Sequence, residues 1–284
     1  MDQTVMDQTV TDTPALTPQD YKSAVKPIWC PGCGDYSVLA AITRAFATLE
    51  LPRHRTAVVS GIGCSSRIPA YTSVYGFHGV HGRALAAASG LKLARPELTV
   101  VVLGGDGDGF SIGGNHFLHA CRRNVNLTYV IMDNEVYGMT KGQASPTTES
   151  DWCHSKLTPH GPGVSPVQPV PLAISCGANF VARGFAGDPN GVARLIVEGI
   201  RHPGFSVIQV LSPCVTFRPE QRGWKSTVHP YGREPAQDAA IALRHAVEDD
   251  GFGLGVFLAG NRRPFAPGAE VTTTIDAIEA EFAV

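Results

Sequence analysis

The sequence predicts an α/β protein built on a mainly parallel sheet with helices on both faces. Short apolar runs that fit buried strands alternate along the chain with stretches whose apolar residues recur at helical spacing. The runs at 98–103 and 127–132 each end in a turn rich in glycine or polar residues. In a parallel α/β sheet such turns share the carboxyl edge, where ligands usually bind. The same pattern therefore predicts the fold class and a first location for a site.

Local sequence signals mark where the elements begin and end. Asp35 suits the cap of a helix that starts at residue 36, and Pro96 stops a helix of small apolar residues. Strands that alternate with helices in this way favour parallel pairing. The expected helices cover 36–49, 84–94, 112–123, 171–177 and 189–200. The expected strands cover 55–60, 98–103, 127–132, 180–182 and 206–211.

The remaining stretches set the expected domain limits. Residues 1–20 are polar and contain the duplicate MDQTVMDQTV, so we expect a disordered arm. Residues 21–230 would form the α/β domain, and residues 231–284 a C-terminal segment of mixed pattern. The Gly- and His-rich segment 73–83 is expected to be an active-site loop. The long loop 144–171, rich in Pro, Ser and Thr, is expected to be functional or to contact a partner.

Composition limits the classes of partner. The chain has 284 residues, of which 43% are hydrophobic and 17% charged, with a formal net charge of -2. These values are ordinary for a globular protein and give no reason to expect nucleic acid or an anionic membrane surface. No apolar run reaches the ~20 residues of a membrane span, and the N-terminus lacks the pattern of a signal peptide. We therefore expect a cytoplasmic protein.

A glycine-rich turn and a polar turn follow the two apolar runs. The first, GGDGDG at 104–109, lets bare backbone N–H groups approach an anion, and the second contains Asp-Asn-Glu-Val at 133–136. Oxygens and N–H groups together suit a divalent cation carrying a diphosphate, because Mg²⁺ takes about six oxygen ligands and keeps phosphate among them. For GDG alone, a tight turn with solvated aspartates is the alternative. Asp106 followed by Asn134, with a helix and a strand between them, resembles the thiamine diphosphate motif.

The seven cysteines are expected to be thiols, because an odd number in a chain without a recognisable leader argues against a disulfide framework. Cys30 and Cys33 form a C-x-x-C loop, which alone fits a zinc knuckle, a redox pair or half of an iron–sulfur site. Cys64 and Cys214 each follow a strand, so both can reach the edge that carries the GDG turn. Four thiolates there would bind zinc or a 4Fe–4S cluster, and the alternative is a plain turn with two buried cysteines. A structural role is expected for Cys121, Cys153 and Cys176.

Six motifs in one order indicate a family. They are WCPGCGD, SGIGCSSR, HGR, GGDGDGFSIGGNH, MDNEVYGMTKGQ and SPC. Their order and spacing resemble the β subunit of 2-oxoacid:ferredoxin oxidoreductases, most closely the 2-oxoglutarate type. The resemblance covers residues 26–219 and implies the diphosphate-binding fold of thiamine diphosphate enzymes.

The resemblance also implies three cofactors, namely thiamine diphosphate, Mg²⁺ and one 4Fe–4S cluster. The cluster would be ligated by Cys30, Cys33, Cys64 and Cys214. Magnesium would be held by Asp106, the Asn134 side chain and the Val136 carbonyl oxygen. The diphosphate would contact Gly107, Asp108, Gly138 and Met139. Gly105, in the same turn as Gly107 and Asp108, would also line the cofactor site. Thiamine diphosphate would also be approached by Ile62, Gly63, Cys64, Ser65 and His81.

Two basic side chains are candidate catalytic residues. His81 would hydrogen-bond a phosphate or the substrate carboxylate, although a histidine in a Gly-rich loop is as often a surface residue, and sequence alone does not separate it from His78. Lys141 follows the expected diphosphate contacts and would offer a cation to a substrate carboxylate or phosphate. A solvated loop lysine is the equal alternative.

The implied reaction is the oxidative decarboxylation of a 2-oxoacid with coenzyme A, with electrons passing through the cluster to ferredoxin. Enzymes that resemble this chain use a glutamate from a second domain, and no second α/β domain fits here. We therefore expect an α subunit that completes the site, contacts with it from 144–171 and 231–284, and an αβ or (αβ)2 assembly.

Other functions remain open at this stage. Within the family, the substrate would be 2-oxoglutarate, pyruvate or a branched-chain 2-oxoacid. A NAD-dependent oxidoreductase fits less well, because GGDGDG has no G-x-G-x-x-G register and its acids would repel a pyrophosphate without a metal. A non-catalytic zinc-binding subunit is a further alternative.

Overall fold

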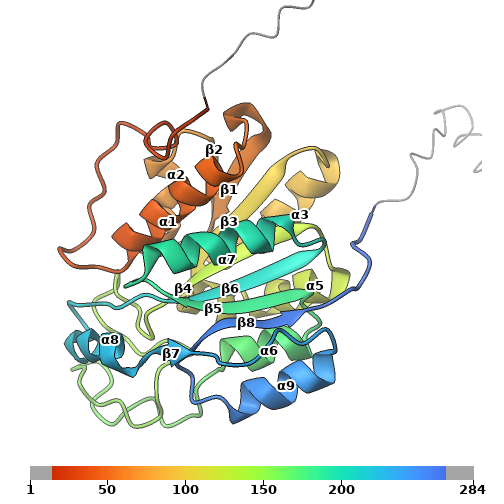
Figure 1. Ribbon diagram of the computed structural model, residues 1–284. Coiled ribbons are helices and arrows are strands. Elements are labelled where there is room, and N and C mark those ends of the chain that lie inside the picture. Colours follow the sequence, from red (N-terminus) through yellow and green to blue (C-terminus); the bar gives the residue numbers. More distant parts are fainter. Residues whose placement is uncertain (1–14, 267–284) are drawn as a thin grey trace, which may run out of the picture.

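The computed structural model describes residues 15–266, so the expectations for 1–14 and 267–284 lie outside the described residues. Its centre is an eight-stranded sheet with the order β2-β1-β3-β4-β6-β5-β8-β7 (Figure 1). The strands are β1 (Thr56–Ser60), β2 (Tyr75–His78), β3 (Thr99–Gly105), β4 (Leu127–Asp133), β5 (Phe180–Phe185), β6 (Phe205–Leu211), β7 (His229–Pro230) and β8 (Gly253–Ala259).

The sheet is parallel from β2 through β5, as the alternating pattern predicts. Among the described strands, β8 runs antiparallel to its neighbour β5. The central strands β4 and β6 are buried along their whole length, which requires apolar residues on both faces. Gly105 of β3 lies opposite Met132 of β4 in the register, so the two strands end side by side. This register brings the two predicted ligand turns together.

Helices cover both faces of the sheet (Figure 1). On one face α1 (Asp35–Thr48) packs against α7 (Pro189–Arg201). The other face is covered by α3 (Ala84–Ala94), α5 (Gly114–Arg123), α6 (Pro169–Ser175) and α9 (Ala239–Glu248). The short helices are α2 (Ile68–Tyr71), α4 (Asp106–Phe110) and α8 (Trp224–Thr227), with single 3-10 turns η1 (Arg53–Arg55), η2 (Ser65–Arg67) and η3 (Pro219–Gly223).

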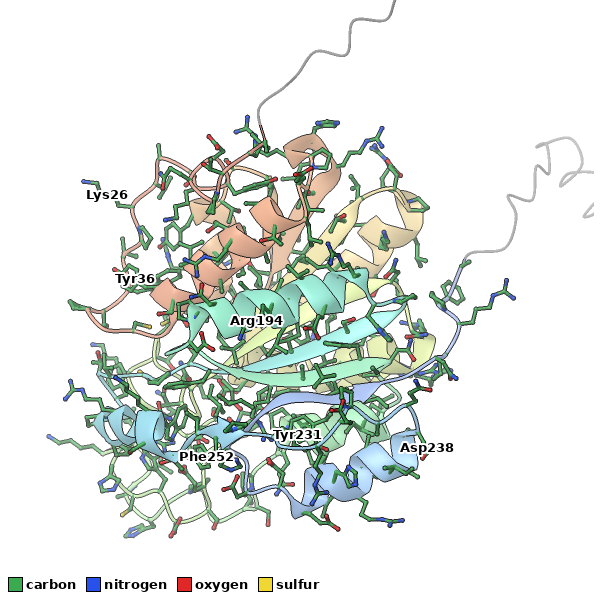
Figure 2. All side chains as sticks on the ribbon, in the orientation of Figure 1. Lys26, Tyr36, Arg194, Tyr231, Asp238 and Phe252 are labelled. Carbon is green, nitrogen blue, oxygen red and sulfur yellow. The ribbon has the colours of Figure 1, made fainter. Side chains whose placement is uncertain are left out.

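Side chains from both layers of helices form two apolar cores, one on each face of the sheet. Phe46 of α1 and Val101 of β3 belong to the first, and Phe117 of α5 and Val102 of β3 to the second. Neighbouring residues of one strand thus enter opposite cores, as the strand period of two requires. At the start of α9, the side chain of Asp238, labelled in Figure 2, accepts the backbone N–H groups of Ala240 and Ile241.

The structure corrects several expected boundaries near the site. Residues 75–78, expected to be part of a loop, form the edge strand β2, whose side chains are exposed. The GDG turn continues directly into the short helix α4, so the next helix begins at Gly114 and not at residue 112. Asp35 does not cap α1. Gly34 occupies that position, while the buried Asp35 carboxyl accepts the Ser212 hydroxyl at 3.0 Å.

The two ends of the described chain are more ordered than the sequence suggests. The sheet continues past the expected limit at residue 230, because β8 pairs with β5 and α9 packs on α6. At the other end, residues 15–20, expected to belong to a disordered arm, contain a turn in which Asp20 accepts the Thr17 hydroxyl at 2.6 Å. No helix within residues 15–266 is long and apolar enough to cross a membrane.

Candidate functional site

A cavity of about 590 Å³ opens at the carboxyl edge of β1, β3 and β4. Parallel strands that end at one edge bring their following turns together, which explains why segments distant in sequence share the wall. Each residue predicted to approach thiamine diphosphate or magnesium lies in this wall. These residues are Ile62, Gly63, Cys64, Ser65, His81, Gly105, Asp106, Gly107, Asp108, Asn134, Val136, Gly138 and Met139.

Tyr137 forms part of the wall and explains the glycine at position 107. The hydroxyl of Tyr137 donates to the Gly107 carbonyl oxygen at 3.3 Å, and its ring occupies the space that a Cβ at residue 107 would need. A larger residue at 107 would therefore displace the ring and reshape the cavity.

Asp106, in the wall of the cavity, lies close to a second buried carboxyl group, that of Asp133. Thr147 Oγ1 lies 2.9 Å from Asp106 Oδ2 and 2.8 Å from Asp133 Oδ1. Each of these aspartates is only 2% exposed. A hydroxyl carries one proton, so Thr147 can donate to only one of the two carboxylates. The remaining negative charge requires a proton or a cation nearby.

The electrostatics of this pair fit a divalent metal ion. Burial and the charge of Asp133 raise the pKa of Asp106 to about 7, and burial raises the pKa of Asp133. A cation beside Asp106 would offset both effects and favour the ionised carboxylate. The predicted set of one carboxylate, one side-chain amide and one carbonyl oxygen consists of the hard oxygen ligands that Mg²⁺ prefers.

The turn that carries Asn134 and Val136 is held in an uncommon backbone conformation. Glu135 between them has a φ of 53°, which costs a non-glycine residue about 1 kcal/mol. Asn134 Oδ1 accepts the Val136 N–H at 3.1 Å. The Glu135 carbonyl oxygen accepts the Thr148 hydroxyl at 2.6 Å and Arg218 Nη1 at 3.1 Å. These bonds oppose the strain and hold the turn in this conformation.

Asp108 ties three segments of the wall together. Its Oδ1 accepts the backbone N–H of Ile62 at 2.9 Å and that of Gly82 at 2.8 Å, and it lies 2.9 Å from His81 Nδ1. A carboxylate beside Nδ1 favours the tautomer with its proton on that nitrogen. The Nε2 atom of His81 then remains to meet a ligand in the cavity. His78 lies on β2, so the structure separates the two histidines.

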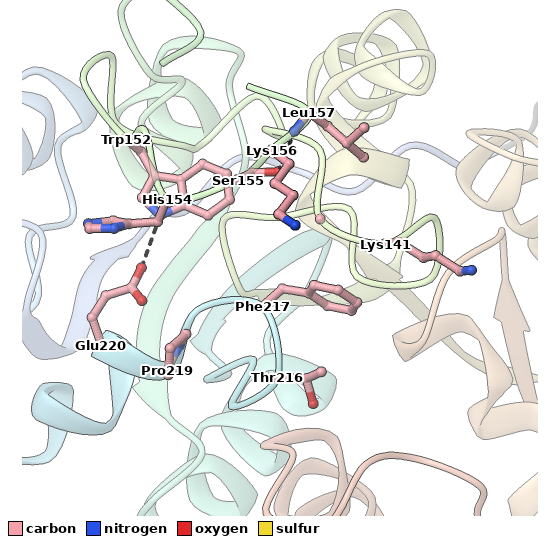
Figure 3. A pocket seen from close by; sticks show the side chains of 11 residues that line it. Lys141, Trp152, His154, Ser155, Lys156, Leu157, Thr216, Phe217, Pro219 and Glu220 are labelled. Atoms are coloured by element: carbon pink, nitrogen blue, oxygen red, sulfur yellow. Dashed lines mark hydrogen bonds between the residues drawn. The ribbon is translucent and has the colours of Figure 1, made fainter. Parts of the chain in front are cut away.

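Lys141 lies in a neighbouring cavity of about 620 Å³ and not in the wall described above. Figure 3 shows its side chain pointing away from Phe217, with Lys156 and His154 on another part of the wall. The exposed position of Lys141 fits both expectations, a cation for an anionic group and a solvated loop residue.

Hydrogen bonds join the three segments that carry the predicted cluster ligands. Trp29 Nε1, next to Cys30, donates to the carbonyl oxygen of Cys64 at 2.8 Å. The N–H of Gly34 donates to the carbonyl oxygen of Pro213 at 3.2 Å. The C-x-x-C loop is therefore fixed against both the Cys64 turn and the Cys214 turn.

The cysteine site adjoins the cavity through Gly138. A Cβ placed on Gly138 would lie 3.7 Å from the Cys214 sulfur and 3.8 Å from the Cys64 sulfur. Burial and the nearby Asp35 charge raise the pKa of Cys64 to about 11, and the same causes raise that of Cys33. Cationic iron or zinc would favour the thiolates.

All seven cysteines are free thiols in this structure. Cys30 is exposed, Cys121 is buried in the core, and Cys153 is exposed in the long loop. Within residues 15–266, no group of three or more His, Cys, Asp or Glu side chains already has the geometry of a metal site. Ligation by Cys30, Cys33, Cys64 and Cys214 remains a prediction.

Comparison with known proteins shows the family. The model of the thiamine pyrophosphate enzyme C-terminal TPP binding domain matches residues 61–210, which include the turns of the cavity. The 2-oxoglutarate oxidoreductase subunit KorB of Mycobacterium tuberculosis is 41% identical over 250 residues, covering 84% of this chain and 65% of the relative. The 2-oxoacid:ferredoxin oxidoreductase subunit beta of Saccharolobus solfataricus is 42% identical over 225 residues, covering 78% and 73%. The chain belongs to the 2-oxoacid:ferredoxin oxidoreductase β subunits.

A solved structure supports the same family and fold. One chain of 2-oxoglutarate:ferredoxin oxidoreductase from Magnetococcus marinus, with 2-oxoglutarate, coenzyme A and succinyl-CoA bound, is 39% identical to this β subunit. The TM-score is 0.89, and the match covers 95% of this chain and 97% of that chain. The expected family and fold class are confirmed. The match to the Mycobacterium tuberculosis subunit covers just under two thirds of that relative.

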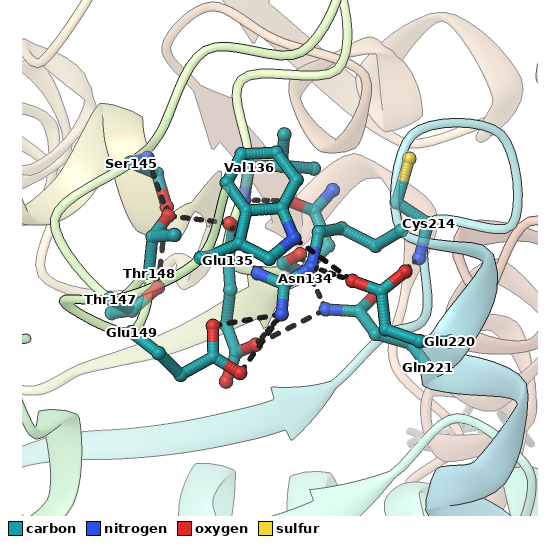
Figure 4. A network of polar contacts seen from close by, with 12 residues as sticks. Asn134, Glu135, Val136, Ser145, Thr147, Thr148, Glu149, Cys214, Glu220 and Gln221 are labelled. Carbon is teal, nitrogen blue, oxygen red and sulfur yellow. Dashed lines mark hydrogen bonds and ion pairs between the residues drawn. The ribbon is translucent and has the colours of Figure 1, made fainter. Parts of the chain in front are cut away.

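Several residues that build the site in this β subunit were missed by sequence reasoning. Arg218 is 2% exposed, lies within 2.8 Å of Glu149 and stacks on Trp152 at 4.7 Å. Figure 4 shows the network to which these contacts belong. The Ser- and Thr-rich start of the 144–171 loop was a usable signal for Thr147. Asp133 and Tyr137 lie in the motif MDNEVYGMTKGQ but were given no role, and no local pattern marks Arg218 or Gln221.

Proposed function

We propose that this chain is the β subunit of a thiamine diphosphate- and coenzyme A-dependent enzyme that converts 2-oxoglutarate to succinyl-CoA and CO2, with ferredoxin as the electron acceptor. The observation that carries the proposal is the common wall of two sites. Cys64 and Gly138 line the cavity. Gly138 also lies next to the cysteines, because a Cβ placed on it would be 3.8 Å from the Cys64 sulfur and 3.7 Å from the Cys214 sulfur. A site for an electron-releasing cofactor therefore adjoins a set of thiols suited to an electron acceptor.

Thiamine diphosphate, when bound, supplies a carbanion that adds to the 2-oxo carbon and accommodates the electrons left by departing CO2. In this proposal Asp106, the Asn134 side chain and the Val136 carbonyl oxygen hold Mg²⁺ with the diphosphate. His81 is oriented by Asp108, and in its doubly protonated form it would donate from Nε2 to a phosphate or the substrate carboxylate. Lys141 offers a second cation from the neighbouring cavity.

One 4Fe–4S cluster would be held by Cys30, Cys33, Cys64 and Cys214. Two observations support this ligation. Hydrogen bonds join the segments that carry the four cysteines, and four free thiols are the ligands that an all-cysteine 4Fe–4S site requires. Burial raises the pKa values of Cys33, Cys64 and Cys214, which favours their neutral thiols until a cation is present. The cluster would carry electrons from the cavity to ferredoxin.

An α subunit would complete the site. Large apolar side chains are exposed on and beside the cavity wall, a pattern that favours coverage by another protein. They are Ile62, Tyr75, Phe77, Val80, Ile112 and Met139. We propose that the α subunit covers them in an αβ or (αβ)2 assembly and supplies the activating glutamate. The 144–171 loop and the segment 231–284 are further candidate contacts.

The test uses the αβ complex purified without oxygen. We expect about four irons and four sulfides per β chain, and reduction of ferredoxin that requires both 2-oxoglutarate and coenzyme A. Pyruvate and a branched-chain 2-oxoacid serve as rival substrates, and a faster rate with either would replace 2-oxoglutarate in the proposal. Zinc without a visible chromophore would contradict the cluster and favour a zinc-binding subunit.

A further inference from the structure

Gln221 hydrogen-bonds the backbone of both candidate cofactor sites. Its Nε2 donates to the carbonyl oxygen of Asn134 at 2.8 Å, and its Oε1 accepts the backbone N–H of Cys214 at 2.9 Å. Figure 4 shows Gln221 beside Cys214 and Asn134. The side chain is only 1% exposed, so water does not compete for either bond. Each such bond contributes about 1 kcal/mol, and more is lost when a buried partner is left without one.

The backbone of Gln221 is fixed to the Cys214 turn. Its N–H donates to the Arg218 carbonyl oxygen at 3.0 Å, and the N–H of Arg218 donates to the Cys214 carbonyl oxygen at 2.8 Å. Because of these two hydrogen bonds, a displacement of Cys214 would also move the turn η3. The side chain of Gln221 extends from this turn to the end of β4 and reaches Asn134.

The Asn134 end of the contact is also held in place. Next to Asn134, the strained Glu135 accepts Arg218 Nη1 on its carbonyl oxygen at 3.1 Å, and its carboxyl lies 3.2 Å from Arg218 Nη2 and 3.2 Å from Gln221 Nε2. Arg218 is itself buried against Glu149 and Trp152. A displacement of this turn must therefore break buried hydrogen bonds or move η3 and Cys214 with it.

Resting on the proposed function, we propose that Gln221 is a positioning residue that couples occupancy of the magnesium and diphosphate site to the reduction potential of the cluster. One amide is shared between the turn that presents the Asn134 ligand and the loop that presents the Cys214 ligand. Potentials of iron–sulfur clusters depend on hydrogen bonds and solvent near the ligand sulfurs, so a small change at Cys214 is measurable. By linkage, the oxidation state of the cluster then changes the affinity for Mg²⁺ and thiamine diphosphate by the same factor.

The test measures the midpoint potential of the cluster in the αβ complex by an EPR-monitored redox titration, with and without thiamine diphosphate and Mg²⁺. We expect the wild type to shift when the cofactor is added, and a coupling of about fivefold corresponds to about 40 mV for a one-electron couple. In Gln221→Met, which removes both hydrogen bonds at similar side-chain length, we expect less than half of that shift at wild-type iron content.

A second variant separates the two ends of the amide. Gln221→Glu keeps an acceptor for the Cys214 N–H but replaces the donor to Asn134 by an oxygen. The new carboxyl group can change the potential measured without cofactor, so the diagnostic quantity is the shift, and we expect most of the shift on adding the cofactor to be lost. If Gln221→Met does not fold, Gln221→Glu decides the result.

Asn179→Asp is the matched control, because it makes the same type of change in another buried amide. Asn179 donates to the Pro203 carbonyl oxygen at 2.7 Å and accepts the Arg262 N–H at 3.0 Å, at the amino edge of the sheet. We expect a lower Tm and the full wild-type shift. A wild type with no shift, or folded Gln221 variants that both retain it, would overturn the proposal. Absence of a cluster signal or of cofactor binding in the wild type would instead contradict the proposed function.

Discussion

The two turns proposed to hold magnesium and the four cysteines proposed to hold the cluster lie on one edge of the sheet. The two sites differ in how firmly hydrogen bonds within the protein hold their ligand groups in place. Around Asp106 and Asn134, the protein supplies hydrogen bonds from Thr147, Thr148 and Arg218. Around the cysteines, hydrogen bonds join the backbone segments that carry the thiols.

The difference follows from the chemistry of the donors. Carboxylate, amide and carbonyl oxygens accept strong hydrogen bonds, so the protein can hold them in place before a cation arrives. A thiol is a weak donor and a weak acceptor, so little besides the metal orients it. The oxygen ligands of the proposed magnesium site are thus held in place by the protein, and in the proposed cluster site the metal would complete the arrangement of the thiols.

The largest effect is expected at the site that depends on its metal. Cys214→Ser should lose the broad visible absorbance and ferredoxin reduction together. Hydrogen exchange measured by mass spectrometry should become faster in segments 29–34 and 213–217, because the cluster no longer holds them. The matched control Cys153→Ser, in the exposed part of the long loop, should retain all three properties. Electron transfer at the wild-type rate in Cys214→Ser would exclude Cys214 as a required ligand.

The next effect is expected at the carboxylate of the proposed magnesium site. Asp106→Asn keeps the shape of the side chain but removes the charge, so affinity for Mg²⁺ and thiamine diphosphate should fall by about 100-fold or more. Isothermal titration calorimetry measures this affinity, and circular dichroism should show an unchanged fold. Asp151→Asn, a change of an exposed carboxylate, serves as control. Unchanged cofactor affinity in Asp106→Asn would remove Asp106 from the site.

A smaller effect is expected when the support of the carboxylate is removed. Thr147→Val deletes the hydroxyl between Asp106 and Asp133, and Mg²⁺ affinity should fall by about 10- to 100-fold. Thr147→Ser restores a hydroxyl and should recover most of the affinity. Equal affinity in all three proteins would show that the hydroxyl does not preorganise the site.

The smallest effect is expected for Lys141, outside the main cavity. Lys141→Met should raise KM for the 2-oxoacid or for coenzyme A by about fivefold, or ~1 kcal/mol, because the lysine is exposed and its charge is screened by solvent. Affinity for thiamine diphosphate should not change. Lys225→Met on α8 should leave KM unaltered. A loss of kcat in Lys141→Met without a change in KM would instead indicate a role at the reacting atoms.

The sequence by itself determined the parallel sheet, the family and most residues of the cavity wall. Apolar runs specify buried strands locally, and the turns after neighbouring strands such as β3 and β4 meet at one edge for reasons of topology alone. Asp106 and Asn134 could be identified because glycine-rich and polar turns are local signals.

Only the tertiary structure decided the contacts that cross between elements. Thr147 meets Asp106, and Gln221 meets both Asn134 and Cys214, because a long loop and a 3-10 turn fold back over the edge of the sheet. Periodicity likewise could not predict that β8 pairs with β5, because the sequence pattern of a strand does not specify which strand it pairs with. Such contacts depend on packing between distant segments, and no local spacing in the sequence encodes them.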